Sequence, residues 1–488
     1  MIPLCKRVEI HSIGARALSS IVSLCPARVN SPAAWKSRPA CDTMGLMFTK
    51  IRDYLFGSVF RAGASVLTML ILASNALGLL RDMLFSRIFG ASRLLDVYSA
   101  AFVVPDILLN VFVAGALTAA FVPVFSHLRA HGDDEESERV ATTMFAAAPA
   151  AMFFIGVVAF IFMPQVAHLV APGFTADETA LLIRMSRLML LSPVLFALSN
   201  TLGGVLVSLD RFVGYGLSSV LYNVGIIAGI FLTPKFGPIG LVIGTLFGAV
   251  LHLASRLIAL ARTRFRVRGP VQLANRNFLQ ILKLMIPRMA GQPIEQLTFS
   301  IFTNLASTLT IGSIAVVNFA RNFQSMPISV FGIAFSMAVF GSLSRKAALK
   351  DRAGFIYHLK ETAKPLLIAS VISAVVYVVF GSWIVGLLLG GGKFGPDAVH
   401  KTAVLLALFA LAIPAENSIH LLVRGFYALK DTWTPILISI PGLGLIWLLS
   451  KALIPVLDVN ALGLAYAISL TTQALILFFL LRRKLRSL

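Results

Sequence analysis

The chain has 488 residues, of which 58% are hydrophobic and 13% charged, and its formal net charge is +21. This composition excludes an ordinary soluble globular protein and indicates a chain that lies largely in a membrane. The positive charge does not indicate a nucleic-acid partner, because it is spread over short segments between apolar stretches and no basic soluble domain is present.

The N-terminal residues 1–59 form a basic extension that precedes the apolar sequence. All three cysteines lie in it, so neither a disulfide framework nor a cysteine metal site is expected in the remainder. Its first 45 residues lack the apolar core of a signal peptide. We consider a disordered cytoplasmic extension, and an upstream start codon with true initiation at Met44 or Met47. We favour the second, because residues 50–61 already resemble a short basic interfacial helix.

Roughly a dozen apolar stretches follow, each long enough to cross a hydrocarbon core of about 30 Å as a helix. We therefore predict an all-α polytopic membrane protein of about 12 transmembrane helices. The predicted spans are 62–86, 97–125, 141–169, 179–208, 214–233, 238–261, 279–308, 313–343, 363–389, 401–427, 434–455 and 460–481.

Lysine and arginine concentrate in every second gap between these spans. The gaps after spans 2, 4, 6, 8 and 10 and the tail at 482–488 carry most of them, whereas the other gaps are nearly cation-free. Since short cytoplasmic loops are enriched in these residues, both termini are predicted to be cytoplasmic.

The longest basic connection, 262–283, has six spans before it and six after it. This predicts a cytoplasmic linker between two six-helix lobes, 60–261 and 284–481, around a central cavity. Many transporters hold a substrate between two such repeats and alternate its access.

Polar side chains within the spans are the best functional clues, because in hydrocarbon they normally face a bundle interior or a wet cavity. The first half contains Arg81, Asp82, Asp96 and Asp106. The second half contains Arg288, Glu295, Arg321, Asn322, Glu416, His420 and Arg424.

Several of these residues also have a structural explanation. Arg81 either lines an anion-binding cavity or pairs with Asp82 near the interface. Arg321 lies nearly mid-span, too far from a helix end for easy snorkelling, so we expect it to line the cavity.

The remaining ionisable residues are open to both interpretations. Arg288 and Glu295 share a helix face, which fits an intrahelical network as well as a substrate site. Glu416 and His420, one turn apart, form either a packing pair, which we favour, or a proton relay.

No enzyme constellation emerges from the sequence. It contains no Walker loop, no His-Glu-x-x-His pair and no Gly-x-Ser-x-Gly elbow. We expect no cofactor and no metal site. Transport would then depend on a coupling cation, sodium or proton, or on the membrane potential.

Several segments, in order over about residues 60–481, resemble the MurJ (MviN) family of lipid II flippases in the multidrug/oligosaccharidyl-lipid/polysaccharide exporter superfamily. They include Leu-Gly-Leu-Leu-Arg-Asp at 77–82, Arg-Ile-Phe-Gly-Ala at 87–91, Ala-Pro-Gly-Phe at 171–174 and Gly-Phe-Tyr-Ala-Leu-Lys-Asp-Thr at 425–432.

The resemblance implies a flippase that carries undecaprenyl-pyrophosphate-linked peptidoglycan precursor across the bacterial inner membrane by alternating access. It implies lipid II and membrane lipids as partners. Cell-wall synthesis proteins are considered as further partners, and we expect the protein to be a monomer. Arginines would bind the diphosphate, for which a guanidinium is chemically suited. Of the polar residues in the spans, Arg81, Asp82 and Asp96 match positions of the family. With the other intramembrane polar residues added as candidates from their positions in the spans, the predicted substrate-binding residues are Arg81, Arg321, Arg288, Arg424 and Asn322. The predicted orienting or coupling residues are Asp82, Asp96, Glu295, Glu416 and His420.

The sequence also departs from this family's pattern. Asn75, Leu109, Asn110 and Asn322 stand where the family often has arginine, and the chain ends after span 12, whereas the family commonly continues through two further spans. Two alternatives therefore stay open: another polysaccharide-lipid or drug/cation exporter of the superfamily, and a membrane scaffold that does not transport.

Overall fold

A computed structural model describes residues 59–114, 116–291 and 293–486; side chains are not described at 59–65, 113–119, 287–288 and 290–293. By its internal contacts the chain divides at residue 62, and residues 63–488 form one compact unit. All that follows concerns this second unit.

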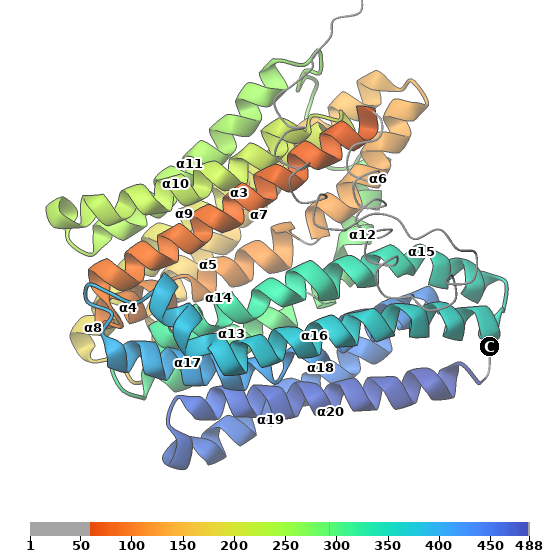
Figure 1. Ribbon diagram of the computed structural model, residues 1–488. Helices are drawn as coiled ribbons and strands as arrows, with labels where there is room; N and C mark the ends of the chain where they lie inside the picture. The colour runs from red at the N-terminus through yellow and green to blue at the C-terminus, as the bar shows by residue number, and fades with distance from the viewer. Residues whose placement is uncertain (1–58, 115, 292, 487–488) are drawn as a thin grey trace, which may run out of the picture. The chain divides into compact units, whose positions relative to one another are not determined.

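The first half of the unit is built from helices α3 to α11, with one π-helical turn, η1 (Figure 1). Their bounds are α3 Val59–Phe89, α4 Arg93–Ala101, α5 Val103–Leu108, η1 Leu109–Ala114, α6 Ala116–Ala130, α7 Asp134–Val170, α8 Ala176–Met189, α9 Leu191–Ser208, α10 Phe212–Phe236 and α11 Ile239–Ala261.

The second half runs from α13 to α20, and α12 joins the two halves. Their bounds are α12 Arg276–Gly291, α13 Pro293–Ser307, α14 Ser313–Pro327, η2 Ile328–Ile333, α15 Ala334–Ala348, α16 Arg352–Leu388, α17 Pro396–Ala410, α18 Ile413–Ala428, α19 Trp433–Leu457 and α20 Asn460–Lys484.

The described residues of all twelve predicted spans are mostly helical, which confirms the all-α polytopic fold. By length and composition, ten helical stretches in the described residues could cross a membrane, or eleven if α17 and α18, which meet at a 40° bend, form one span. The predicted span 279–308 is not among them, because it is divided between α12 and α13 on either side of residue 292.

Two spans are broken by a proline, and in each a side chain from another helix satisfies the carbonyl that proline leaves free. Pro105 cannot donate to the Ala101 carbonyl, which accepts from Ser186 Oγ at 3.4 Å. Pro327 likewise cannot donate to Phe323, whose carbonyl accepts from Tyr377 OH at 2.8 Å. A π-helical turn follows each break, η1 after α5 and η2 after α14.

Helices α10 and α11 lie side by side along their length (Figure 1). Glycines allow this approach: a Cβ on Gly225 would lie 2.2 Å from the Gly248 Cα, and one on Gly244 would lie 2.2 Å from the Gly229 Cα. Small residues bring transmembrane helices close in this way, so these glycines account for the tight packing of the pair.

The buried core consists of three main clusters. The largest joins the halves, because it combines α4 residues such as Leu95 and Val97 with α14 residues such as Val316. The second draws its members from 120–281, and the third from 339–485. The halves therefore share a core at one end, whereas each keeps its own core elsewhere.

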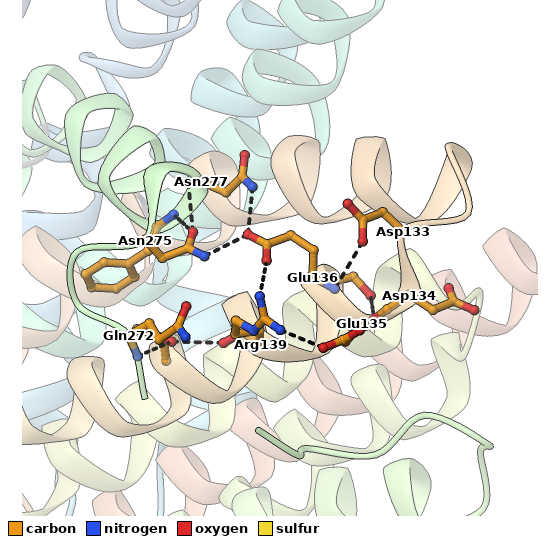
Figure 2. A network of polar contacts seen from close by, with 11 residues as sticks. Asp133, Asp134, Glu135, Glu136, Arg139, Gln272, Asn275 and Asn277 are labelled. Atoms are coloured by element: carbon orange, nitrogen blue, oxygen red, sulfur yellow. Dashed lines mark hydrogen bonds and ion pairs between the residues drawn. The ribbon is translucent and has the colours of Figure 1, made fainter. Parts of the chain in front are cut away.

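The linker after α11 is fixed to the start of α7 (Figure 2). Glu136 Oε1 accepts hydrogen bonds from Asn275 at 2.7 Å and Asn277 at 2.9 Å, and Gln272 N donates to Thr143 Oγ1 at 3.1 Å. Helix α12, which begins within the predicted linker, packs against α6 and α7. The acidic run at 133–136 is therefore a contact point for the linker as well as a helix cap.

Candidate functional site

The cation-poor gaps of the two halves meet at one end of the unit. Ser86 Oγ donates to the Leu389 carbonyl at 2.9 Å, and Lys393 N donates to the Arg87 carbonyl at 2.9 Å. Gly173 N donates to Ser307 Oγ at 3.2 Å. These bonds tie helix ends and loops of one half to helix ends and loops of the other, so this end is closed.

Asp96 is central to this closure. Its carboxylate accepts from the backbone N–H groups of Gly312 at 2.7 Å and Ala315 at 2.9 Å, at the N-terminus of α14. A carboxylate at a helix N-terminus satisfies unpaired N–H groups and the helix dipole. Asp96 is 1% exposed and does not line the cavity described next, so it acts here as an interhelical cap.

A cavity of about 410 Å³ lies between the halves. Helices α3, α4, α5, α9 and α10 contribute to its lining from the first half, and α13 and α14 from the second. Its charged and amide lining residues are Arg81, Asp82, Asp106, Gln296, Asn318 and Asn322.

Arg81, Asp82 and Asn322 form a bridge across this cavity. The Arg81 guanidinium donates to Asp82 Oδ1 from Nε at 3.0 Å and from Nη2 at 2.9 Å. Asn322 Nδ2 of the second half donates to Asp82 Oδ2 at 2.8 Å. Arg81 Nη1 also reaches Asn223 Oδ1 at 3.4 Å. The predicted pairing of Arg81 with Asp82 and its predicted cavity position thus coexist.

Arg321 lies away from this cavity, in a separate buried network of the second half. It donates to Gln324 Oε1, and its Nη1 lies 3.9 Å from Glu416 Oε2. The same carboxylate oxygen accepts from Gln324 Nε2 at 2.8 Å and from Tyr466 OH at 2.9 Å. Our expectation that Arg321 lines the cavity is not met here, because α14 turns it toward α18 and α20.

An aromatic ring separates Arg321 from the cavity. Its guanidinium carbon lies 4.9 Å from the centre of the Phe299 ring, which itself lines the cavity, and 4.7 Å from the Tyr466 ring. Arg321 Nε is buried without a hydrogen-bond partner. Cation–π contacts of this kind partly replace the water that the guanidinium has lost.

The other predicted site residues do not line this cavity. The Arg288 side chain lies outside the described residues. Glu295 is exposed on α13, and Arg424 lies about 5.9 Å from the Phe340 and Tyr427 rings. His420 makes no hydrogen bond to Glu416 in the described structure, because that carboxylate faces Gln324 and Tyr466 instead.

Sequence reasoning left out several lining residues. Asp106 had a signal, since it is an acidic residue directly after a proline within a span. Gln296 is one residue from Glu295, which the sequence favoured. Tyr98 and Tyr222 are ordinary aromatic residues in sequence terms, and only the packing of α4 and α10 places them at the cavity.

Outside the spans, Asp431 fixes the loop between α18 and α19. It accepts hydrogen bonds from Lys484 and from Thr434. Partial burial acts to raise the pKa of this carboxyl, but the Lys484 and Thr434 hydrogen bonds outweigh burial and lower the pKa to about 2. The Asp431 carboxyl therefore stays ionised at neutral pH, and the stabilisation it contributes is lost as the pH falls below the ordinary carboxyl pKa toward 2.

Within the described residues, no group of three His, Cys, Asp or Glu side chains is placed to hold a metal ion. The features that concern the site are the bridged cavity, the closed end and the Arg321 network beside them.

Comparison with known proteins identifies the family. The model of the family described as lipid II flippase MurJ matches residues 85–488. The chain belongs to this family. Its members are transporters, and the chain is a multi-pass membrane protein.

Curated relatives agree with this membership. The chain is 27% identical over 436 residues to "Lipid II flippase MurJ" of Burkholderia cenocepacia, covering 88% of this chain and 84% of the relative. It is 28% identical over 432 residues to "Probable lipid II flippase MurJ" of Rhizobium tropici, covering 85% and 79%.

Two solved structures share the fold. One, "Lipid II flippase MurJ, inward closed conformation", has a TM-score of 0.73 at 24% identity and covers 85% of this chain and 87% of that chain. The other, an inward-facing multidrug resistance MATE transporter of the MOP superfamily, has a TM-score of 0.74 at 14% identity and covers 85% and 95%.

Proposed function

We propose that this chain moves undecaprenyl-pyrophosphate-linked peptidoglycan precursor, lipid II, across the bacterial cytoplasmic membrane by alternating access. The family membership supports this proposal. The structural observation that supports it most is a cavity that lies between the two halves and is closed at one end. In this cavity Arg81 is paired with Asp82, which also accepts a hydrogen bond from Asn322 of the second half.

The charge pattern gives this proposal an orientation. The closed end consists of the cation-poor gaps, which we place outside, and the arginine-rich gaps are then cytoplasmic together with both termini. The cavity would thus face the cytoplasm, where lipid II is made. Opening would require the bonds of Asp96, Ser86 and Lys393 across the closed end to break.

Arg81 is the lining residue suited to a diphosphate. Its guanidinium presents a fork of donors to phosphate oxygens, and in the described state Asp82 occupies that fork. Substrate would compete with Asp82 for the Arg81 guanidinium, and Asn322 would keep its hydrogen bond to the released Asp82 carboxylate. Exchange of this kind would link substrate binding in the first half to the position of α14.

A second candidate function is export of a cationic molecule. The charged residues lining the cavity are one cation, Arg81, and two carboxylates, Asp82 and Asp106, so the described lining is more acidic than basic. In that case removal of Asp106 would abolish transport, whereas removal of Arg81 would have the smaller effect.

The deciding experiment is complementation in bacteria depleted of their own lipid II flippase, with exposure of lipid II on the outer leaflet as the readout. The chain should restore growth and exposure. Arg81→Ala should lower exposure at least about tenfold, because a hydrogen-bonded charged contact contributes about 1.5–3 kcal/mol. Arg81→Lys should retain part of it, since the charge is kept and the fork is lost.

Arg184→Ala is the matched control, because Arg184 is an exposed cation on α8 outside the cavity. It should behave as the unaltered chain. Full lipid II exposure by Arg81→Ala at normal membrane levels would contradict the proposal.

A further inference from the structure

Asp106 is a carboxylate without a partner inside the cavity. It lies on α5, directly after Pro105, and lines the space between the halves. The described structure gives its side chain neither a hydrogen bond nor an ion pair. Other acidic residues near the cavity differ: Asp82 is paired with Arg81, and Asp96 accepts two backbone N–H groups.

None of the charged or titratable groups around the cavity supplies the missing positive charge. Arg81 is engaged by Asp82 and Asn223. The Tyr98 hydroxyl is bound to Thr245 Oγ1 at 2.8 Å, and Tyr222 carries no positive charge. On α13, Glu295 is itself acidic.

The amide of Asn110, one helical turn from Asp106, is also committed to other groups. Asn110 Nδ2 donates to the backbone carbonyl of Asp106 at 3.0 Å and to Gln296 Oε1 at 3.2 Å, and not to the carboxylate. An uncompensated carboxylate at membrane depth is costly, so side chains of this kind face a cavity and take a partner from it.

We propose that Asp106 binds a monovalent cation, Na⁺ or H⁺, in the cavity. Oxygen atoms suited to a hard cation are available in the same lining on Ser99, Thr303 and Asn318. Binding would bring the charge of Arg81, Asp82 and Asp106 from −1 to zero. The cavity would then repel the diphosphate less, so the cation would load together with the lipid; this last step alone rests on the proposed function.

The test is the thermal unfolding midpoint of the purified full-length chain. It is measured in sodium chloride and in choline chloride at equal ionic strength, and in mildly acidic and mildly alkaline buffer. A ligand that binds the folded state alone raises the midpoint. We expect Na⁺ or acidification to raise it by several degrees, and we expect Asp106→Asn to lose that rise.

Three further variants make the result specific. Asp177→Asn removes an exposed carboxylate from α8, outside the cavity, and should keep the full response. Asp106→Glu keeps a carboxylate and should keep part of it. Asp106→Ser is a second neutral variant, and its unfolding midpoint is measured if Asp106→Asn does not fold.

The sodium and the pH measurements distinguish the two cations. A sodium response lost in the neutral variants assigns Na⁺, and a pH response lost in them assigns H⁺. Equal responses of the unaltered chain and the neutral variants to both conditions would overturn the site. These readouts need no transport, so they decide the site even if the chain fails to flip lipid II.

Coupling is then read in the lipid II exposure assay. Asp106→Asn should still flip lipid II and should lose the dependence on Na⁺ or pH shown by the unaltered chain. An unchanged dependence would overturn the coupling and leave the cation site intact.

Discussion

Arg321 and Asn322 are neighbours on α14 but lie in different surroundings. Asn322 reaches Asp82 in the cavity, whereas Arg321 is 3% exposed and lies among Gln324, Glu416 and three aromatic rings. Successive residues of a helix are turned about 100° apart, so one of them can face the cavity while the next packs against α18 and α20.

Removal of one charge from this network should destabilise the protein. Arg321→Met leaves Glu416 without its cation, and breaking a buried pair costs about 3–5 kcal/mol. We expect a lower thermal unfolding midpoint. Arg321→Met combined with Glu416→Gln should recover part of the loss, because no unpaired charge then remains.

Arg424→Met is the control for loss of one intramembrane arginine, since Arg424 is only partly buried and is not in this network. An Arg321→Met midpoint equal to that of the unaltered chain would show that the pair contributes nothing to folding.

At the scale of elements, the segment after α11 is held by α7. The acidic residues that open α7 have distinct tasks: Asp133 caps the helix through the Glu136 backbone N–H, Glu135 pairs with Arg139, and Glu136 accepts from Asn275 and Asn277 (Figure 2). The linker is therefore attached to the first half, and α12 packs against that half too.

Glu136→Ala should release this linker. The change removes a charged acceptor from two amides, each such bond being worth about 1.5–3 kcal/mol. Trypsin should then cut at the linker arginines, among them Arg264 and Arg268, at least about fivefold faster, as followed by mass spectrometry of native protein.

Glu135→Ala is the matched control, because Glu135 is mostly exposed and contacts only Arg139 of the same helix. Equal cleavage rates in the two variants would show that Glu136 does not fix the linker.

At the scale of the whole unit, closure depends on contacts between segments that are far apart in the sequence. Asp96 and Ser86 of the first half meet residues 312–315 and Leu389 of the second. Gly312 adopts φ +88°, and a Cβ there would lie 2.3 Å from the Ala91 carbonyl oxygen, so the closed end also depends on a residue without a side chain.

Loss of the Asp96 cap should favour the outward-open state. Asp96→Ala frees two N–H groups of α14, and a loss of about 1.5–3 kcal/mol corresponds to a population shift of about 10–100-fold. The measurement is labelling of Ser99→Cys, a cavity position, by a membrane-impermeant thiol reagent from outside. The natural cysteines all lie before residue 60 and can be replaced.

Asp177→Ala removes an exposed acidic residue near the same end and should leave labelling unchanged. Labelling of the Asp96→Ala variant that stays at the level of the unaltered chain would show that other contacts keep this end closed.

The sequence by itself determined the class of fold. Length and apolarity specify a membrane helix locally, so the positions of the helical spans could be read without knowledge of packing. Pro105 and Pro327 are likewise local features of the sequence, because a missing backbone N–H interrupts a helix in any context. Arg81 and Asp82 could be singled out as site candidates for a similar local reason, being adjacent charges within one span.

The tertiary structure decided which polar residues share a cavity. Asn322 and Asp106 line it whereas Arg321 and Asp96 do not, and this depends on how α14, α4 and α5 are rotated against their neighbours. Rotation is set by packing summed over many contacts between distant segments, as in the shared core of α4 and α14. Hydropathy places a helix in the membrane, but it does not specify the face that the helix turns toward its partner.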